Sequence, residues 1–191
     1  MAKGLNHMVD LLELQKRFIL AHLCPGDVAV DCTMGNGNDT AFLSETVGET
    51  GRVYAFDIQE AAIESTRAHL VSLACPENYT LIHASHHRIR EFVKEPPKAV
   101  MFNLGYLPGS GKKQVTTMRE TTMEAVRGAL DLLANDGILL VAVYPGHEEG
   151  RLEGETLGEY FSTLDRRVIC CSCFRIVNSP TSPYFYVVEK K

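Results

Sequence analysis

The sequence predicts an α/β fold: a mostly parallel sheet that ends in an antiparallel hairpin, all within one domain. Short apolar runs alternate with longer amphipathic segments along the chain, which is the pattern of β-α-β units. A glycine-containing turn follows the first apolar run, and the last two runs are joined by too few residues for a crossover helix. A chain of 191 residues is long enough for one domain with a sizeable core.

The expected strands are seven short apolar runs. Five of them precede the hairpin: Val28–Asp31, Arg52–Asp57, Tyr79–His83, Ala99–Asn103 and Ile138–Val143. The fifth run is apolar throughout, as expected for a strand at the buried centre of a parallel sheet. Arg167–Val177 and Tyr184–Lys190 are the hairpin strands, because residues 178–183 cannot hold a helix between them.

The expected helices are the amphipathic segments between these strands. Apolar residues recur at helical spacing in the first segment, which the turn Pro25-Gly26-Asp27 ends. The helices are expected at Val9–Leu23, from Asn38 or Asp39 to Val47, at Glu60–Leu73, His86–Val93, Thr117–Leu133 and Gly150–Leu164. We therefore expect a helical extension over residues 1–26 and a core over residues 27–191.

Composition excludes several classes of protein. No apolar run approaches the roughly 20 residues that span a bilayer, and Met1–Glu13 is too polar for a secretory signal, so we expect a cytoplasmic protein. The net charge of −5 argues against broad nucleic-acid binding but allows a local basic patch. The adjacent Cys170 and Cys171 would point to opposite faces of a strand, and no CxxC pair exists, so we expect buried, reduced thiols and no metal.

The turn after the first strand has the features of a nucleoside site. The run is Asp31-Cys-Thr-Met-Gly35-Asn-Gly37-Asn-Asp39-Thr40, and a strand, a glycine turn and a helix follow one another. Thr40 stands where a dinucleotide motif has its third glycine, and Asp31 and Asp39 flank the turn. Carboxylates oppose a pyrophosphate but suit a sulfonium and an amino group, which favours S-adenosylmethionine over NAD. Asp57, at the end of the second strand, is expected to bind ribose hydroxyls. A purely structural turn remains the alternative.

The fourth strand ends in a second candidate motif, Asn103-Leu-Gly-Tyr106-Leu-Pro108-Gly109. Ligands of open α/β sheets lie beyond the carboxyl ends of the strands, so Asn103 should face the same crevice as Gly35. Its amide oxygen could accept hydrogens from a substrate amine and aim the lone pair of the nitrogen. Tyr106 could stack on a flat substrate ring. A strand-end turn built for conformational reasons is the alternative.

Histidines near these motifs are further candidates. His147 follows the fifth strand and could contact substrate or remove a proton, although a histidine in a loop is more often structural or solvated. Ser85 or His86, after the third strand, could meet the adenine amino group. Lys112, Lys113 and Arg119 follow the second motif, where phosphates could dock, or they belong to a solvated loop.

Together these motifs resemble a known family. The glycine run, Ala55-Phe-Asp-Ile-Gln59, Asn103 to Gly109 and Tyr144-Pro-Gly-His147 are similar to class I methyltransferases of the small bacterial rRNA methylase family. That family includes the tRNA methyltransferases that complete 5-methylaminomethyl-(2-thio)uridine at wobble position 34. The resemblance implies a Rossmann-like fold of seven strands, S-adenosylmethionine as cofactor, a homodimer, and a tRNA anticodon stem-loop as substrate. The match at Asn103 is partial, because Leu104-Gly105 replaces two prolines of the amine-directed motif.

The candidate residues divide by expected role. Catalytic roles are expected for Asn103, Tyr106 and His147. Cofactor contacts are expected from Asp31, Met34, Gly35, Asn36, Gly37, Asn38, Asp39, Thr40, Asp57, Ile58, Gln59, Ser85, His86, Asn103 and Leu104. Substrate contacts are expected from Tyr106, Pro108, Gly109, Lys112, Lys113 and Arg119.

Three other functions stay open at this point. A methyltransferase could act on rRNA or on a small-molecule amine. An NAD-dependent oxidoreductase is opposed by the missing third glycine and the paired acids. A non-catalytic nucleoside-binding module would have no activity for an Asn103→Ala substitution to remove.

Overall fold

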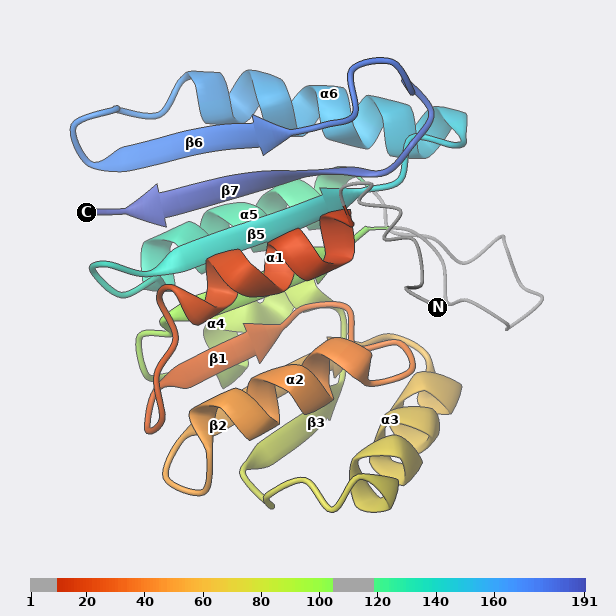
Figure 1. The fold of residues 1–191 in the computed structure, drawn as a ribbon, viewed down its shortest axis with the longest axis vertical. Helices are drawn as coiled ribbons and strands as arrows, with labels where there is room; N and C mark the ends of the chain where they lie inside the picture. Colours follow the sequence, from red (N-terminus) through yellow and green to blue (C-terminus); the bar gives the residue numbers. More distant parts are fainter. Residues whose placement is uncertain (1–9, 105–118) are drawn as a thin grey trace, which may run out of the picture.

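The computed structural model describes residues 10–104 and 119–191, in which seven strands form one sheet (Figure 1). The strand order is β3-β2-β1-β4-β5-β7-β6. The strands are β1 (Val28–Asp31), β2 (Arg52–Asp57), β3 (Tyr79–His83), β4 (Ala99–Asn103), β5 (Ile138–Val143), β6 (Ile169–Phe174) and β7 (Tyr184–Lys190). Strands β1 to β5 are parallel, whereas β7 is antiparallel to both β5 and β6. The predicted parallel sheet with a C-terminal antiparallel hairpin is confirmed.

Helices cover both faces of this sheet (Figure 1). One face carries α1 (Leu11–Leu20), α2 (Asn38–Val47) and α3 (Glu60–Ser72). The other carries the 3-10 turn η1 (His86–Arg88) with α4 (Ile89–Phe92), α5 (Arg119–Leu132) and α6 (Glu148–Ser162). Two apolar cores result, one on each side of the sheet. No helix in the described residues is both long and apolar enough to cross a membrane.

Strand β5, which lies between β4 and β7, is buried along its whole length, as its composition predicts. Its side chains alternate between the two cores, because successive strand residues point to opposite faces. Leu139 and Val141 enter the core beneath α5 and α6, whereas Ile138 and Leu140 enter the core beneath α1 and α2. Helix α1 completes the second core with Ile19, which is fully buried.

Several element boundaries differ from the expected ones for identifiable reasons. Helix α1 begins at Leu11 because the Asp10 carboxylate accepts the Leu12 N–H at 2.9 Å and so caps the helix. Helix α6 begins at Glu148, two residues early, because the His147 ring caps it. Strand β6 is shorter than expected, since its pairing with β7 ends at Phe174. The segment expected as one helix at 86–93 is divided into η1 and α4.

The register places the two candidate motifs on either side of β1. Asp31 is paired with Ala55 of β2 and with Met101 of β4. Asp57 and Asn103 each lie two residues beyond those partners, so both project at the carboxyl edge of the sheet next to the end of β1. Chain order reverses at this point, where β1 meets β4, and open α/β sheets form their ligand crevices at such positions. The expectation that Asp57 and Asn103 share one edge is confirmed.

Candidate functional site

The glycine turn is held tightly against its surroundings. The Met34 N–H donates to the Phe56 carbonyl at 2.9 Å, and the Gly37 N–H donates to the Met34 carbonyl at 2.7 Å. Gly37 has a φ of +82°, and a Cβ atom there would lie 2.9 Å from the Thr66 methyl group of α3. Both the left-handed backbone and this close approach require glycine. The turn is therefore a fixed part of the site.

Asp57 connects the glycine turn to the end of β2. Its two carboxylate oxygens accept the Gly35 N–H at 3.1 Å and the Gln59 N–H at 2.9 Å. Burial raises the pKa of Asp57, against the effect of these backbone donors. Each oxygen keeps a lone pair that a ribose hydroxyl could use. Next to it, Ile58 is 53% exposed and offers an apolar surface at the mouth of the site.

Asp31 is fully buried beside the turn. Its carboxylate accepts the Thr40 hydroxyl at 2.7 Å and the Thr33 N–H at 3.0 Å. Burial, followed by the charge of Asp39, raises its pKa to about 7. Asp31 therefore acts on a bound ligand through its electric field and through the geometry of the turn, rather than as an exposed contact.

Asn103 and Asp39 form the second half of the site. The Asn103 main-chain N–H donates to the Thr33 hydroxyl at 2.7 Å. Its side-chain Nδ2 donates to the Asp39 carboxylate, which belongs to the first turn of α2. Its Oδ1 is buried and has no hydrogen-bond partner among the described residues. An acceptor without a partner is costly to bury, so this oxygen marks a position where a donor from a ligand would fit.

Residues that the sequence did not single out complete the surroundings of Asp39. Burial raises the pKa of Asp39, while the hydrogen bond from Asn103 and the charge of Lys16 on α1 oppose that rise. The Tyr144 phenol has a raised pKa, first through burial and then through the charge of Asp39. Thr33 and Tyr144 lie inside sequence motifs and could have been identified there. Lys16 gives no such signal, because only packing of α1 on the sheet brings it close.

The histidine region after β3 combines packing with an unused polar atom, because the buried Nε2 of His86 has no hydrogen-bond partner among the described residues. The His86 ring is buried, packs edge-on against Phe102 at 5.6 Å, and shares a hydrogen bond of 3.1 Å between Nδ1 and the Cys32 carbonyl. Burial lowers the pKa of His86 to about 4, so the ring is neutral at physiological pH. Ser85 is hydrogen-bonded to His87 at 2.8 Å. His86 therefore lies under the sheet edge, and Ser85 is the more open of the two adenine candidates.

His147 and Arg119 both have partners within the protein. His147 Nδ1 accepts the Gly150 N–H at 3.0 Å, which makes this ring the N-cap of α6. Arg119 forms an ion pair with Glu149 at 2.8 Å. Leu104 is buried and donates its N–H to the Ala142 carbonyl at 3.0 Å. Of the remaining expected cofactor contacts, Met34 and Thr40 are buried and Asn38 is exposed. Tyr106, Pro108, Gly109, Lys112 and Lys113 lie outside the described residues.

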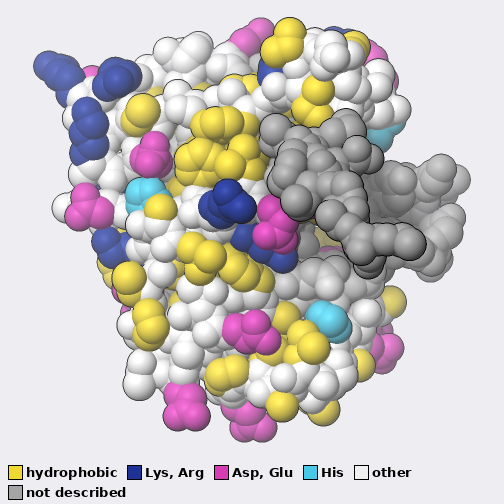
Figure 2. Space-filling view, viewed as in Figure 1, with side chains coloured by type: hydrophobic (Ala, Val, Ile, Leu, Met, Phe, Trp, Pro, Cys, Tyr) yellow, Lys and Arg dark blue, Asp and Glu magenta, His cyan; other side chains and the backbone are white. Residues whose placement is uncertain are grey.

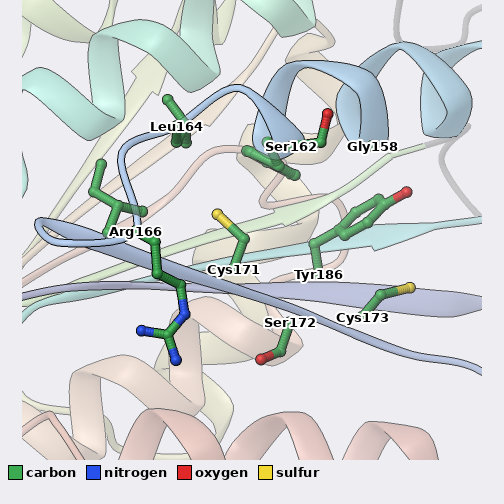
Figure 3. A pocket seen from close by; sticks show the side chains of 10 residues that line it. Gly158, Ser162, Leu164, Arg166, Cys171, Ser172, Cys173 and Tyr186 are labelled. Carbon is green, nitrogen blue, oxygen red and sulfur yellow. The ribbon is translucent and has the colours of Figure 1, made fainter.

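The cysteines do not form a second site. All six are free, and no group of His, Cys, Asp or Glu in the described residues could hold a metal ion. The expectation that they are buried holds for Cys32 alone, because Cys24 and Cys173 are exposed and Cys75, Cys170 and Cys171 are only partly buried. A cavity of about 330 Å³ between α6 and the hairpin is lined by residues that include Cys171 and Tyr186 (Figure 3). Burial raises the pKa of Cys171 to about 11, so its thiol is protonated and unreactive at neutral pH.

The arrangement at the carboxyl edge fits S-adenosylmethionine. Three carboxylates, from Asp31, Asp39 and Asp57, gather around one glycine turn, and burial raises the pKa of each. A cationic ligand would offset the cost of ionising them, whereas a pyrophosphate would add to it. With the Asp57 oxygens available to a ribose, the fold and the site together define a class I S-adenosylmethionine-dependent methyltransferase.

Comparison with known proteins agrees with this class and narrows it. The chain belongs to the family described as "Putative rRNA methylase", whose model matches residues 53–190. The crystal structure of the Clostridium thermocellum "putative rRNA-methylase" is 38% identical, with a TM-score of 0.92, covering 96% of this chain and 99% of that one. A putative methyltransferase from Streptococcus mutans, solved in complex with SAH, is 34% identical, with a TM-score of 0.87 and coverage of 96% and 99%. S-adenosylmethionine is therefore the cofactor.

A curated relative extends the comparison to a plant. The chloroplastic tRNA (mnm(5)s(2)U34)-methyltransferase of Arabidopsis thaliana is 38% identical over 176 residues. The match covers 87% of this chain and 64% of that protein, so the chain spans just under two thirds of the length of its plant relative.

Proposed function

We propose that this enzyme methylates the primary amine of 5-aminomethyl-(2-thio)uridine at wobble position 34 of tRNA, giving 5-methylaminomethyl-(2-thio)uridine. The observation that carries the proposal is Asn103 Oδ1, a buried acceptor without a partner at the carboxyl end of β4. An amine nucleophile carries N–H groups that such an oxygen can accept. The name of the Arabidopsis relative supports the same substrate.

The chemistry requires an amine that is held close, unprotonated and correctly aimed. When bound, S-adenosylmethionine supplies a methyl group on a sulfonium, and the amine forms an N–C bond as the C–S bond breaks. Asn103 contributes by accepting one N–H of the neutral amine, which directs the lone pair away from the amide. An amide oxygen accepts an N–H from an amine in either protonation state, so Asn103 orients the nucleophile, and the amine must lose its extra proton before it attacks. Positioning of this kind accounts for a large part of the rate of bimolecular displacements.

Recognition of an anticodon stem-loop needs positive charge near the carboxyl edge. On the face shown in Figure 2, some Lys and Arg side chains lie at the side near the C-terminal end of the chain, and others lie in the middle of the face beside an acidic side chain. Arg119 is nearer to the site, but its pair with Glu149 would have to open to meet a phosphate. The family resemblance also implies a homodimer, and we propose that the protein is a cytoplasmic homodimer whose second subunit contributes to the RNA-binding surface. Light scattering of the purified protein tests the dimer.

The test uses tRNA from a strain that lacks the gene for this protein. Purified enzyme and S-adenosylmethionine are incubated with this tRNA, and the nucleosides are analysed by mass spectrometry. We expect conversion of 5-aminomethyl-(2-thio)uridine to its N-methyl form, and loss of conversion in Asn103→Ala. Asn135→Ala, an exposed asparagine far along the chain, serves as the matched control. A preparation that binds cofactor but leaves the tRNA nucleoside unchanged rejects the proposal.

The family description favours rRNA as a second candidate substrate. Incubation with a tritiated methyl donor and separate pools of tRNA, rRNA and small metabolites distinguishes the two. Label in rRNA and none in tRNA would replace the proposed substrate while leaving the enzyme class unchanged.

A further inference from the structure

Asp39 and Asn103 are 64 positions apart in the sequence but share one hydrogen bond at the site. Asp39 comes from the first turn of α2, and Asn103 ends β4. The two ends of an amide have nearly the same shape, so rotation of the side chain by half a turn exchanges a donor for an acceptor. The neighbours of the amide decide which end faces the substrate.

An ionised carboxylate settles that choice because it has no hydrogen to donate. It accepts from Nδ2, so Oδ1 must point elsewhere, and Oδ1 is the atom left without a partner among the described residues. The main chain of Asn103 is fixed independently, since its N–H donates to the Thr33 hydroxyl at 2.7 Å. Once the backbone is fixed, the side-chain torsions decide which end of the amide faces the substrate, and the hydrogen bond to Asp39 restricts them.

The surroundings of Asp39 favour this acceptor role. The positive charge of Lys16 and the hydrogen bond from Asn103 both stabilise the ionised carboxylate against the cost of burial. A protonated Asp39 could instead donate to Oδ1 and turn the amide around. Lys16 therefore supports the orientation in which Asn103 is an acceptor for the amine.

A direct cofactor contact is the competing role for Asp39. That role fits the sequence pattern, in which Asp31 and Asp39 flank the glycine turn. In the structure, however, the Asp39 carboxylate holds the amide of Asn103, and Asp57 is the acid bonded to the glycine turn itself. The two roles predict opposite kinetic effects, because a cofactor ligand affects binding and a positioning residue affects turnover.

We propose that Asp39 is a positioning residue that locks the Asn103 amide with its oxygen toward the methyl acceptor, and so favours a nucleophile that can donate a hydrogen bond, as an amine does. The proposal rests on the proposed function, in which the acceptor is an amine. In this role Asp39 acts through Asn103 and not through its own contact with the amine or the methyl group.

Three variants test the role of Asp39. Asp39→Ala removes the acceptor, Asp39→Asn keeps an acceptor but allows either amide orientation, and the double variant D39N/N103D exchanges the two groups. In the exchanged pair, the amide at position 39 donates to a carboxylate whose second oxygen can accept from the substrate. Glu60→Ala is the control, because Glu60 is also an acid in the first turn of a helix but is exposed and away from Asn103.

Turnover and cofactor binding are measured on each full-length variant. For Asp39→Ala we expect kcat to fall about 10- to 100-fold, while the Kd for S-adenosylhomocysteine stays within about threefold. Asp39→Asn should lie between this variant and wild type. D39N/N103D should recover at least about tenfold over N103D alone, which a merely structural role would not produce. A Kd that weakens more than about tenfold with kcat unchanged would overturn the proposal and make Asp39 a cofactor ligand.

A measurement without substrate separates this proposal from the proposed function. The side-chain amide resonances of Asn103 are assigned by nuclear magnetic resonance through comparison with Asn103→Ala. In Asp39→Ala we expect these resonances to shift and their hydrogens to exchange with solvent faster; an unchanged signal overturns the positioning role. Failure of wild-type enzyme to methylate tRNA would instead reject the proposed substrate, whatever the resonances show.

Discussion

Replacement of Asp31 by asparagine should stabilise the protein at alkaline pH and weaken its hold on the cofactor. Asp31 is fully buried, and burial together with the charge of Asp39 raises its pKa to about 7. Asparagine has the same shape and can keep both contacts of the carboxylate: its oxygen can accept the Thr33 N–H, and its amide can donate to the Thr40 hydroxyl. The substitution therefore removes the buried charge with little change in packing.

The size and sign of the effect follow from proton linkage. Between about pH 4 and pH 7 the native protein keeps the Asp31 proton that the unfolded chain has lost, so stability falls as pH rises through this window. A pKa raised from 3.8 to about 7 corresponds to a loss of roughly 4 kcal/mol in the free energy of unfolding across this window, at about 1.4 kcal/mol per pKa unit. The Asp31→Asn variant lacks this loss. It should match wild type near the acid end of the window and exceed it by about 2–4 kcal/mol near pH 8.

Urea unfolding of both proteins at about pH 5 and about pH 8 measures the difference. Glu120→Gln, which neutralises an exposed acid, controls for the change in net charge. Calorimetry should show that Asp31→Asn binds S-adenosylmethionine more weakly and loses part of its preference over S-adenosylhomocysteine, which lacks the sulfonium. A variant less stable than wild type at about pH 8, or a wild-type stability that does not change across the window, would refute the reasoning.

Three further substitutions probe the site. Gly37→Ala should lower the free energy of unfolding by about 2–5 kcal/mol, because the left-handed backbone is strained and the new methyl group crowds α3. Gly26→Ala is the control: Gly26 also has a positive φ but only an ordinary contact at 3.5 Å, so the loss should be about 1–2 kcal/mol. Equal losses in urea unfolding would show that the turn at Gly37 is not packed tightly against α3. His147→Ala removes the N-cap of α6, so its free energy of unfolding should fall by about 0.5–2 kcal/mol, and that of His147→Asn should fall much less. In both variants kcat should be nearly unchanged. A large fall of kcat in His147→Asn would instead show that the ring accepts a proton in the reaction. Asp57→Ala should weaken S-adenosylhomocysteine binding at least about tenfold by calorimetry, and binding at wild-type strength would exclude it from the ribose site.

The sequence alone determined the strands and most of the helices, and it placed the candidate site at the carboxyl edge of the sheet. The alternation of apolar runs and helical segments gave every strand of the described sheet, because period-two and period-3.6 patterns are local properties of a chain. The short connection before Tyr184 determined the antiparallel hairpin. Because parallel strands share one carboxyl edge, the positions of Asp57 and Asn103 at strand ends were enough to place both at one crevice.

Only the tertiary structure decided what each polar side chain does at that edge. Asp31, Asp39 and Asp57 look alike in sequence, yet one is buried beside the turn, one holds the amide of Asn103 and one bonds the glycine turn. In the same way His147 proved to be a helix cap. Burial and hydrogen-bond partners depend on residues distant in the chain, such as Lys16 beside Asp39. A local sequence pattern does not show which distant residues pack beside a side chain, so the roles of these aspartates and of His147 could be assigned only from the folded structure.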